Sequence, residues 1–422
     1  MAQAELAGGI PGQLVTTDGV PLKTSLRRAD RRRRITAFLL VLPLLAFIVI
    51  TFIMPIGDML WRSVENQAIT DNLPRTVEAM EDWDGEGLPP ESVYAAMVED
   101  LRVGQAERTI GPVGIRLNYE MSGARSLINS SARAARDLEP PYKEALNDVH
   151  RSWRNPEIWR IIQRESRPLT ASYYVSAVDM RYAEDGSIVR QPAHQRIYID
   201  LFLRTLLLSV AITGLTLLLG YPIAFLLATL PMRYSNLLMI LVLLPFWTSL
   251  LVRTTAWIVL LQQQGVVNDV LIAMGLLSDA NRLQMIHNWI GTLIAMTHIL
   301  LPFMVLPLYS VMKGIPPSYM RAARSLGATP WTAFWKVYVP QTLPGIGAGG
   351  VLVFIISIGY YITPALVGGQ SGQMISNLIA YHMQRSLNWG LGAALGSILL
   401  ASVLILYWAY SKFFGTDNVK LG

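Results

Sequence analysis

The chain has 422 residues, of which 52% are hydrophobic and only 15% charged. A typical soluble domain is roughly 25% charged, so this composition excludes an ordinary soluble globular protein and indicates a membrane protein. The formal charge of +6 does not require nucleic acid as a partner, and the absence of cysteine excludes disulfides, thiolate metal sites and cysteine nucleophiles.

Charge is unevenly divided along the chain. Residues 61 to 200 hold 22 of the 29 acidic residues and 17 of the 35 basic ones, a net charge of −5. The rest keeps 18 basic and 7 acidic residues, a net charge of +11. We therefore expect one mixed-charge domain in water and a membrane-embedded remainder with basic margins.

The N-terminus begins with a basic tail. Residues 1 to 34 are rich in glycine and small polar residues and end in RRADRRRR, so we expect a disordered cytoplasmic tail. Residues 35 to 60 contain an apolar run long enough to cross a bilayer. A cleaved signal peptide is the alternative, but the apolar run is too long for one and no A-x-A site follows it. We therefore predict that residues 35 to 60 form the first transmembrane helix.

Residues 61 to 200 form a predicted extracytoplasmic insertion domain. The segments ESVYAAMVEDL, SLINSSARAARDLE and PYKEALNDV have helical spacing, whereas residues 171 to 191 read as two short strands around a Glu-Asp-Gly turn. The domain shows neither metal-ligand spacing nor a nucleophile elbow, and His150 and His194 read as surface residues. Its function cannot be inferred from these features.

Five further apolar stretches complete a predicted six-span all-α membrane protein. With the N-terminus inside, the loops at 230 to 236 and 312 to 344 and the tail at 414 to 422 are cytoplasmic, and a core of five helices covers 201 to 413. These cytoplasmic segments are rich in lysine and arginine, as the positive-inside rule requires. The expected spans are residues 203 to 229, 237 to 260, 288 to 311, 345 to 367 and 391 to 413.

Residues 315 to 346 carry the clearest local pattern. Pro316 and Pro317 suit the first turn of a helix, and Gly327 can adopt the left-handed conformation that ends one. Thr329 and Pro330 repeat the start signal, and the next helix carries four aromatic residues at spacings of three and four, predicting one shared face along a membrane surface. An ordinary helical hairpin or a DNA-binding helix-turn-helix are alternative readings of this stretch alone.

This stretch resembles the loop shared by inner-membrane permease subunits of binding-protein-dependent ABC importers, whose pattern runs Glu-Ala-Ala, Gly and hydrophobic-Leu-Pro. Ala322, Ala323, Gly327 and Leu343-Pro344 match it, while Arg321 stands where the family most often has glutamate. The resemblance implies a type I importer permease in a bacterial inner membrane. It implies as partners a homologous second permease, two ATPase subunits and an extracytoplasmic solute-binding protein. The ATPase-coupling residues that it implies are Arg321, Ala322, Ala323, Arg324 and Gly327.

The chain has no G-x-x-x-x-G-K-[ST] phosphate loop. We therefore expect a non-catalytic transport subunit that binds no cofactor and no metal, with ATP and magnesium held by the partner ATPase. A short rigid helix with a small-residue face would transmit the ATPase movement to the spans.

Three stretches, at residues 244 to 268, 359 to 380 and 387 to 400, resemble spermidine/putrescine permeases, specifically the first of the two paired subunits. Sites for polycations combine carboxylates with aromatic faces. After Asp200 the acidic residues are Asp269, Asp279 and Asp417, all outside the expected spans, so aromatic residues dominate the pathway candidates. The candidates are Trp247, Trp257, Tyr360, Tyr361, Arg253 and His298.

Each pathway candidate has a structural alternative. The aromatic residues can be interfacial or packing residues, Arg253 can extend its charge to the interface, and His298 can be a polar contact within the bundle. Within the importer class, an opine, an amino-acid derivative or an organic cation is an alternative solute. A secondary transporter would require intramembrane carboxylates, and a membrane-anchored sensor or enzyme would require a catalytic constellation in residues 61 to 200; neither is apparent.

Overall fold

The computed structural model describes residues 22–183 and 185–414. The chain divides into two compact units, Met1–Trp61 and Arg62–Gly422. Residues 1–21 of the basic tail, Glu184 in the expected turn and most of the C-terminal tail lie outside the described residues.

The first unit is helical from Leu22 onward. Helix α1 (Leu22–Ile48) leads through a π-helical turn (Val49–Ile53) into α2 (Met54–Arg62). The basic run up to residue 34 is therefore helical, whereas the sequence analysis expected disorder. Arginine and alanine are good helix formers, and a long apolar helix next to them removes the cost of nucleation.

Both π-helical turns in the described residues stand directly before a proline. The N–H of Met54 donates to the carbonyl of Val49, and the N–H of Val339 donates to that of Phe334, in each case five residues earlier. Pro55 and Pro340 come next. Because a proline ring clashes with the carbonyl four residues before it, we attribute the wider turn in each helix to the proline.

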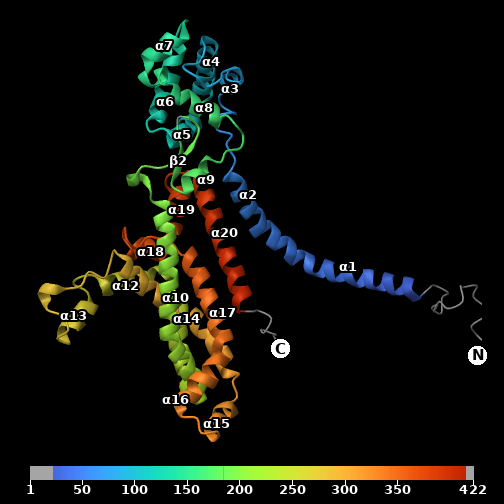
Figure 1. Ribbon diagram of the computed structural model, residues 1–422, viewed down its shortest axis with the longest axis vertical. Helices are drawn as coiled ribbons and strands as arrows, with labels where there is room; N and C mark the ends of the chain where they lie inside the picture. Colours follow the sequence, from blue (N-terminus) through green and yellow to red (C-terminus); the bar gives the residue numbers. More distant parts are fainter. Residues whose placement is uncertain (1–21, 184, 415–422) are drawn as a thin grey trace, which may run out of the picture. The chain divides into compact units, whose positions relative to one another are not determined.

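The insertion domain is the first part of the second unit (Figure 1). It has a helical body, a two-stranded antiparallel hairpin and short 3-10 turns at Ala135–Asp137, Arg151–Arg154 and Ala193–Gln195. Its helices are α3 (Pro74–Ala79), α4 (Glu91–Glu107), α5 (Gly111–Glu120), α6 (Ala124–Ala134), α7 (Tyr142–Val149), α8 (Pro156–Glu165) and α9 (Ser172–Ala177), and its strands are β1 (Met180–Tyr182) and β2 (Ile188–Arg190).

The core of the insertion domain is built around two tryptophans. Trp153 and Trp159 are fully buried, and their rings pack 4.8 Å apart. The Trp153 indole donates to the Ser131 hydroxyl (2.8 Å), and the Trp159 indole donates to the Trp153 carbonyl (3.1 Å). Each buried N–H thus has a partner, which removes the penalty of burying a polar group.

The expected hairpin is confirmed, because Met180 pairs with Arg190 and Tyr182 with Ile188. The residues before it, Ser172–Ala177, form helix α9 instead of the start of a strand. Alternating patterns this short fit a helix or a strand equally well, and tertiary packing decides between them.

The remainder of the second unit is the permease core. A 3-10 turn at Asp279–Asn281 precedes α14, and a π-helical turn at Phe334–Tyr338 links α16 to α17. The core helices are α10 (Tyr198–Thr229), α11 (Met232–Trp247), α12 (Leu250–Leu261), α13 (Val266–Ala273), α14 (Trp289–Lys313), α15 (Pro317–Ser325), α16 (Pro330–Ala333), α17 (Val339–Gly359), α18 (Ile362–Val367), α19 (Ile375–Gln384) and α20 (Trp389–Phe414).

Six helical runs in the described residues are long and apolar enough to cross a membrane, which confirms the expected number of spans. The predominantly helical fold, with a large insertion after the first span, is likewise confirmed. The six runs are Ala29–Arg62, Tyr198–Thr229, Leu250–Ala273, Trp289–Lys313, Pro330–Gly359 and Trp389–Lys412.

The expected span at 237 to 260 is interrupted. Helix α11 ends at Trp247 and α12 begins at Leu250, where the Ser249 hydroxyl accepts the N–H of Val252 as an N-cap. Pro245 removes one backbone donor just before this break. Hydropathy alone does not detect such a break, because both helices are apolar.

Helices α10, α14 and α17 form the centre of the core. Glycines permit their close approach: a Cβ on Gly220 of α10 would lie 3.3 Å from Met304 and Val305 of α14, and one on Gly349 of α17 would lie 2.8 Å from the Met304 sulfur. Small residues commonly bring membrane helices together in this way, because apolar burial gives little driving force inside lipid.

Candidate functional site

Helix α15 and the turn after it form a compact hairpin with defined caps. Pro316 is the extended N-cap residue and Pro317 is the first helical residue. At the other end, Gly327 has φ +88°, its N–H donates to Arg324 (3.0 Å), and the Ala328 N–H donates to Ala323 (3.1 Å). This pair of bonds is a Schellman motif, which uses a left-handed residue to satisfy the last carbonyls of a helix.

The surface of α15 is open. None of its residues is buried; Arg321, Ala322 and Arg324 are exposed and Ala323 is partly buried. Within the second unit, α15 lies at one end of the permease core and the insertion domain lies at the opposite end (Figure 1). The five coupling candidates are thus grouped on one short, accessible helix and its cap.

The aromatic residues after α15 do not share one face. Trp331 and Trp335 pack against each other (5.6 Å) and remain 71% and 51% exposed, whereas Phe334 and Tyr338 stack (5.7 Å). The Phe334 and Tyr338 rings both pack edge-on against Phe225 of α10. This corrects the expected single face, because Phe334 and Tyr338 pack against α10 while Trp331 and Trp335 remain exposed beside them.

The helix that begins at Pro330 continues without interruption to Gly359, at the end of a membrane span. The sequence analysis expected a separate surface helix and placed residues up to 344 in the loop. Pro340 and Pro344 both lie inside this helix, and the π-helical turn accommodates the first of them. Helix α15 itself ends at Ser325, before this continuous helix begins.

Three pathway candidates lie close together in α12 and α14. The Trp257 indole N–H donates to Nδ1 of His298 (3.2 Å), and the two rings meet edge-on at 5.3 Å. Arg253 lies one helical turn before Trp257, and its buried Nε has no hydrogen-bond partner among the residues that the structure describes.

Tyr360 and Tyr361 occupy a break between α17 and α18. The Ser376 hydroxyl donates to the Tyr360 carbonyl (2.7 Å), and the Asn377 side chain donates to that of Tyr361 (2.7 Å). These bonds from α19 satisfy carbonyls that a broken helix would leave free, as irregular backbone at membrane depth requires. The Tyr361 side chain is 39% exposed, and Trp247, at the end of α11, is 71% exposed. Within residues 22–183 and 185–414, no hydrogen bond or ring contact joins the side chain of Trp247 or Tyr361 to Arg253, Trp257 or His298.

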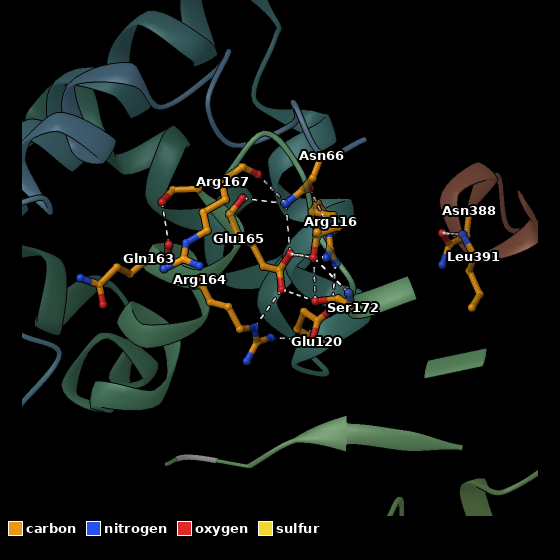
Figure 2. Close-up of polar contacts among 12 residues, drawn as sticks. Asn66, Arg116, Glu120, Gln163, Arg164, Glu165, Arg167, Ser172, Asn388 and Leu391 are labelled. Atoms are coloured by element: carbon orange, nitrogen blue, oxygen red, sulfur yellow. Dashed lines mark hydrogen bonds and ion pairs between the residues drawn. The ribbon is translucent and has the colours of Figure 1, made fainter. Parts of the chain in front are cut away.

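A second polar cluster lies inside the insertion domain (Figure 2). The fully buried Glu165 carboxylate accepts hydrogen bonds from Arg116 (2.5 Å), Asn66 (3.0 Å) and Ser172 (2.6 Å), and also from Arg164 (2.9 Å). Glu120 bridges the same two arginines at 2.9 and 2.7 Å. Two carboxylates and two guanidiniums thus form a closed, neutral network.

Burial of Glu165 opposes its ionisation, but the Arg116 guanidinium and the other donors outweigh this, so the pKa of Glu165 is below its ordinary value. Burial likewise opposes the charge on Arg116, and Glu165 outweighs it, so the pKa of Arg116 is raised. Both shifts favour the ion pair. This network was not predicted from the sequence, because its members come from four separated segments and only the Arg116 and Glu120 spacing gives a local signal.

Side-chain packing and hydrogen bonds join the insertion domain to the core. The Arg116 guanidinium stacks 4.8 Å above the Tyr173 ring, and that ring lies against Gly390 of α20. The Tyr174 hydroxyl is 2.8 Å from the hydroxyl of Ser397 in α20. Asp179 accepts the backbone N–H groups of Ile197, Tyr198 and Ile199 at 2.8 to 3.1 Å. Since these N–H groups open α10, Asp179 caps a membrane span from a distance in sequence.

A cleft of about 1890 Å³ lies between the insertion domain and the turn from α19 to α20. Its rim mixes carboxylates with guanidiniums, and Arg164 covers the Tyr182 ring at 4.6 Å. The tyrosines that line it are Tyr119, Tyr173, Tyr182, Tyr198 and Tyr381. Because the charges are mixed, the cleft favours neither cationic nor anionic ligands. No group of three or more metal-ligand side chains occurs in the described residues.

These features define a multi-pass membrane transport subunit with an exposed hairpin at one end of its helical core. Residues 198–413 match the family model for the binding-protein-dependent transport system inner membrane component, which is half of the chain. The chain belongs to this family of ABC importer permeases of the inner membrane.

Two relatives illustrate the similarity. The spermidine/putrescine transport system permease protein PotB of Haemophilus influenzae is 36% identical over 219 residues, covering 51% of this chain and 76% of that protein. Its counterpart in Escherichia coli K12 is 33% identical over 219 residues, covering 51% and 79%. A solved structure of a bacterial alginate ABC transporter with its alginate-bound periplasmic protein aligns with a TM-score of 0.43 at 21% identity, covering 51% of this chain and 78% of that one.

Proposed function

We propose that this chain forms one half of the translocation pathway of an ATP-driven importer for polyamines such as spermidine and putrescine. A homologous second permease forms the other half, two ATPase subunits supply the energy, and an extracytoplasmic binding protein delivers the solute. The observation that carries the proposal is the family match over the core together with the open α15 hairpin at one end of that core. The names of the PotB relatives support the solute class.

In this proposal α15 faces the cytoplasm and the insertion domain faces the outside. The basic residues near α15 support this orientation, since cytoplasmic loops carry an excess of lysine and arginine. Both termini are then cytoplasmic. The binding protein approaches from the end that carries the insertion domain, and ATP and magnesium bind to the ATPase subunits.

ATP-driven closure would displace α15, and the displacement would pass through the continuous helix from Pro330 to Gly359 into the core. The Schellman cap at Gly327 and the N-cap at Thr329 keep the hairpin rigid. A rigid element transmits a displacement that a flexible loop would absorb. Arg321, Ala322, Ala323, Arg324 and Gly327 are the residues that we assign to coupling.

For the pathway we propose Trp247, Trp257, Tyr360, Tyr361, Arg253 and His298. Aromatic faces can stack on the cationic groups of a polyamine. In the apolar helical runs of the core the carboxylates are Asp200 and Asp269, each near one end of its run, so the second permease would supply the acidic groups along the pathway. Arg253 favours a second candidate solute, since its buried, unpaired Nε suits a carboxylate-bearing molecule such as an opine or an amino-acid derivative.

Uptake of radiolabelled solute tests the proposal. Cells that lack their own polyamine importers would receive this chain with its cognate permease, ATPase and binding protein. Saturable spermidine or putrescine uptake that requires ATP would support the polyamine importer. Uptake of a carboxylate-bearing solute with no competition from polyamines would select the second candidate, and the absence of ATP-dependent uptake of either class would contradict the importer.

A further inference from the structure

The free tip of α15 is cationic and has no carboxylate near it. Lys313, Arg321, Arg324 and Lys336 are all exposed. None of them takes part in an ion pair in the part of the chain that the structure describes. The sequence contains no aspartate or glutamate between Asp279 and Asp417. These positive charges therefore remain unneutralised within the core.

Topology alone does not account for this pattern. The positive-inside rule counts lysine and arginine, and acidic residues contribute little to it. A cytoplasmic loop could therefore hold aspartate or glutamate without loss of orientation. The complete absence of aspartate and glutamate leaves only positive charge on the hairpin. A surface that carries one sign of charge favours a partner surface of the opposite sign.

An exposed apolar side chain lies at the same tip. Leu326, the C-cap residue of α15, is 90% exposed, and it directly precedes the left-handed Gly327. The short side chains of Ala322 and Ala323 leave the middle of the helix without bulky groups. A small apolar projection with cations on the same helix fits a groove that has an apolar floor and acidic walls.

The occupant of this surface is a protein rather than a lipid layer. Trp331 and Trp335 come after the tip, and such tryptophans are typical of the level at which a membrane meets water. Within the core, α16 lies between α15 and the helices of the bundle, so α15 lies farther out (Figure 1). The tip is therefore on the aqueous side of the tryptophan pair.

We infer that α15 docks into an acidic groove on the partner ATPase, with Arg321 and Arg324 facing carboxylates and Leu326 entering an apolar pocket. This inference rests on the proposed function and adds the chemistry of the partner surface. Family members that carry glutamate at the position of Arg321 would fit such a groove poorly. The charge of this helix thus determines which ATPase the permease accepts.

The test measures binding of the cognate ATPase subunit to the full-length permease complex in nanodiscs at several salt concentrations. We expect affinity to fall steeply with salt. Arg321→Glu with Arg324→Glu should weaken binding at least tenfold and flatten the salt dependence. Leu326→Ser should weaken binding several-fold with the salt dependence unchanged. Because α15 buries no side chain, these variants should insert and fold normally.

Arg385→Glu is the control for each single reversal, Arg321→Glu or Arg324→Glu, because it makes the same change of charge at an exposed site in the segment after α19, towards the opposite end of the core. It should leave binding unchanged. Replacing groove carboxylates of the ATPase with lysine should restore binding to the Arg321→Glu and Arg324→Glu variant. Binding that is indifferent to these reversals would overturn the inference while leaving the importer intact.

Two other outcomes are also decisive. Loss of binding by the double variant only in nanodiscs with anionic lipid would assign the cations to lipid and overturn the acidic groove. Failure of the unmodified permease complex to bind the ATPase at any salt concentration would overturn the proposed function and this inference with it.

Discussion

The Tyr173 ring of α9 lies against Gly390 in the first turn of α20, where a Cβ atom on residue 390 would be 2.4 Å from the ring. The same ring is also contacted by the Arg116 guanidinium of the buried network, 4.8 Å from the ring centroid. One tyrosine thus joins the polar interior of the insertion domain to the last membrane span. The insertion is therefore built into the core at this point, and does not hang from it as a loop.

Replacing Gly390 with alanine should loosen this junction. The added methyl group must displace a ring that Arg116 also contacts, and such overpacking costs about 1–3 kcal/mol. The thermal unfolding temperature of the purified complex should fall. Gly214→Ala is the matched control, since a Cβ there meets nothing within 4 Å. If the two variants unfold at the same temperature, the junction does not contribute to stability.

Replacing Arg116 with methionine should destabilise the insertion domain by about 3–5 kcal/mol, because it leaves the Glu165 charge buried without its main partner. Tryptophan fluorescence reports on this domain through Trp153 and Trp159, and urea titration gives the loss. Arg154→Met is the control, because its ion pair with Asp148 is exposed on both sides. Equal effects of the two substitutions would contradict a structural role for the buried network.

The same network predicts the sign of an acid response. Because the pKa of Glu165 is lowered in the folded state, its ionisation contributes stability that is present above the ordinary glutamate pKa. That contribution disappears as the pH falls below the ordinary value towards the lower, folded-state pKa. An acid titration followed by tryptophan fluorescence should therefore lose part of its transition in Glu165→Gln. An unchanged transition would show that other carboxylates govern the acid response.

At the hairpin, Gly327 should tolerate asparagine better than valine. Asparagine adopts the left-handed conformation readily, whereas a β-branched residue at φ +88° is strained by roughly 1–2 kcal/mol or more. We expect Gly327→Asn to retain most solute uptake and Gly327→Val to lose most of it at equal membrane abundance. Ala323→Trp should also abolish coupling by blocking close approach. Normal uptake by Ala323→Trp at normal expression would remove α15 from the coupling mechanism.

For the pathway, Trp257→Phe keeps an aromatic face but removes the hydrogen bond to His298. We expect a higher concentration for half-maximal uptake with little change in the amount of protein in the membrane, because the substitution disturbs the aromatic group near Arg253. Trp408→Phe, at an exposed tryptophan of α20, is the control. Equal uptake curves for both variants and the unmodified protein would make Trp257 a packing residue.

Much of the fold could be predicted from the sequence, because apolar runs of about twenty residues have few alternatives to membrane helices. The hairpin at α15 was also readable, since Pro317 and Gly327 mark its ends through rules of local conformation. The distribution of charge also predicted a division between an inserted domain and a membrane core, which stays a prediction. Each of these signals either lies within a short stretch of sequence or is a hydropathy or charge summed over many residues.

The parts that escaped prediction depend on contacts between distant segments. Glu165, Arg116 and Asn66 lie on separate elements, and nothing in their sequence neighbourhoods shows that they meet. The Asp179 cap on α10 is likewise invisible, because the capping residue lies far before the helix. Continuity of helix through Pro340 was missed because it depends on a π-helical turn.

The most direct test of the account is ATP hydrolysis by this permease reconstituted with its cognate second permease and ATPase, with and without the binding protein loaded with spermidine or putrescine. We predict that the loaded binding protein stimulates hydrolysis, and that Ala323→Trp abolishes the stimulation. Hydrolysis that is unaffected by any loaded binding protein, or an ATPase that does not associate with this permease, would contradict the assignment of the chain as the coupled half of an importer.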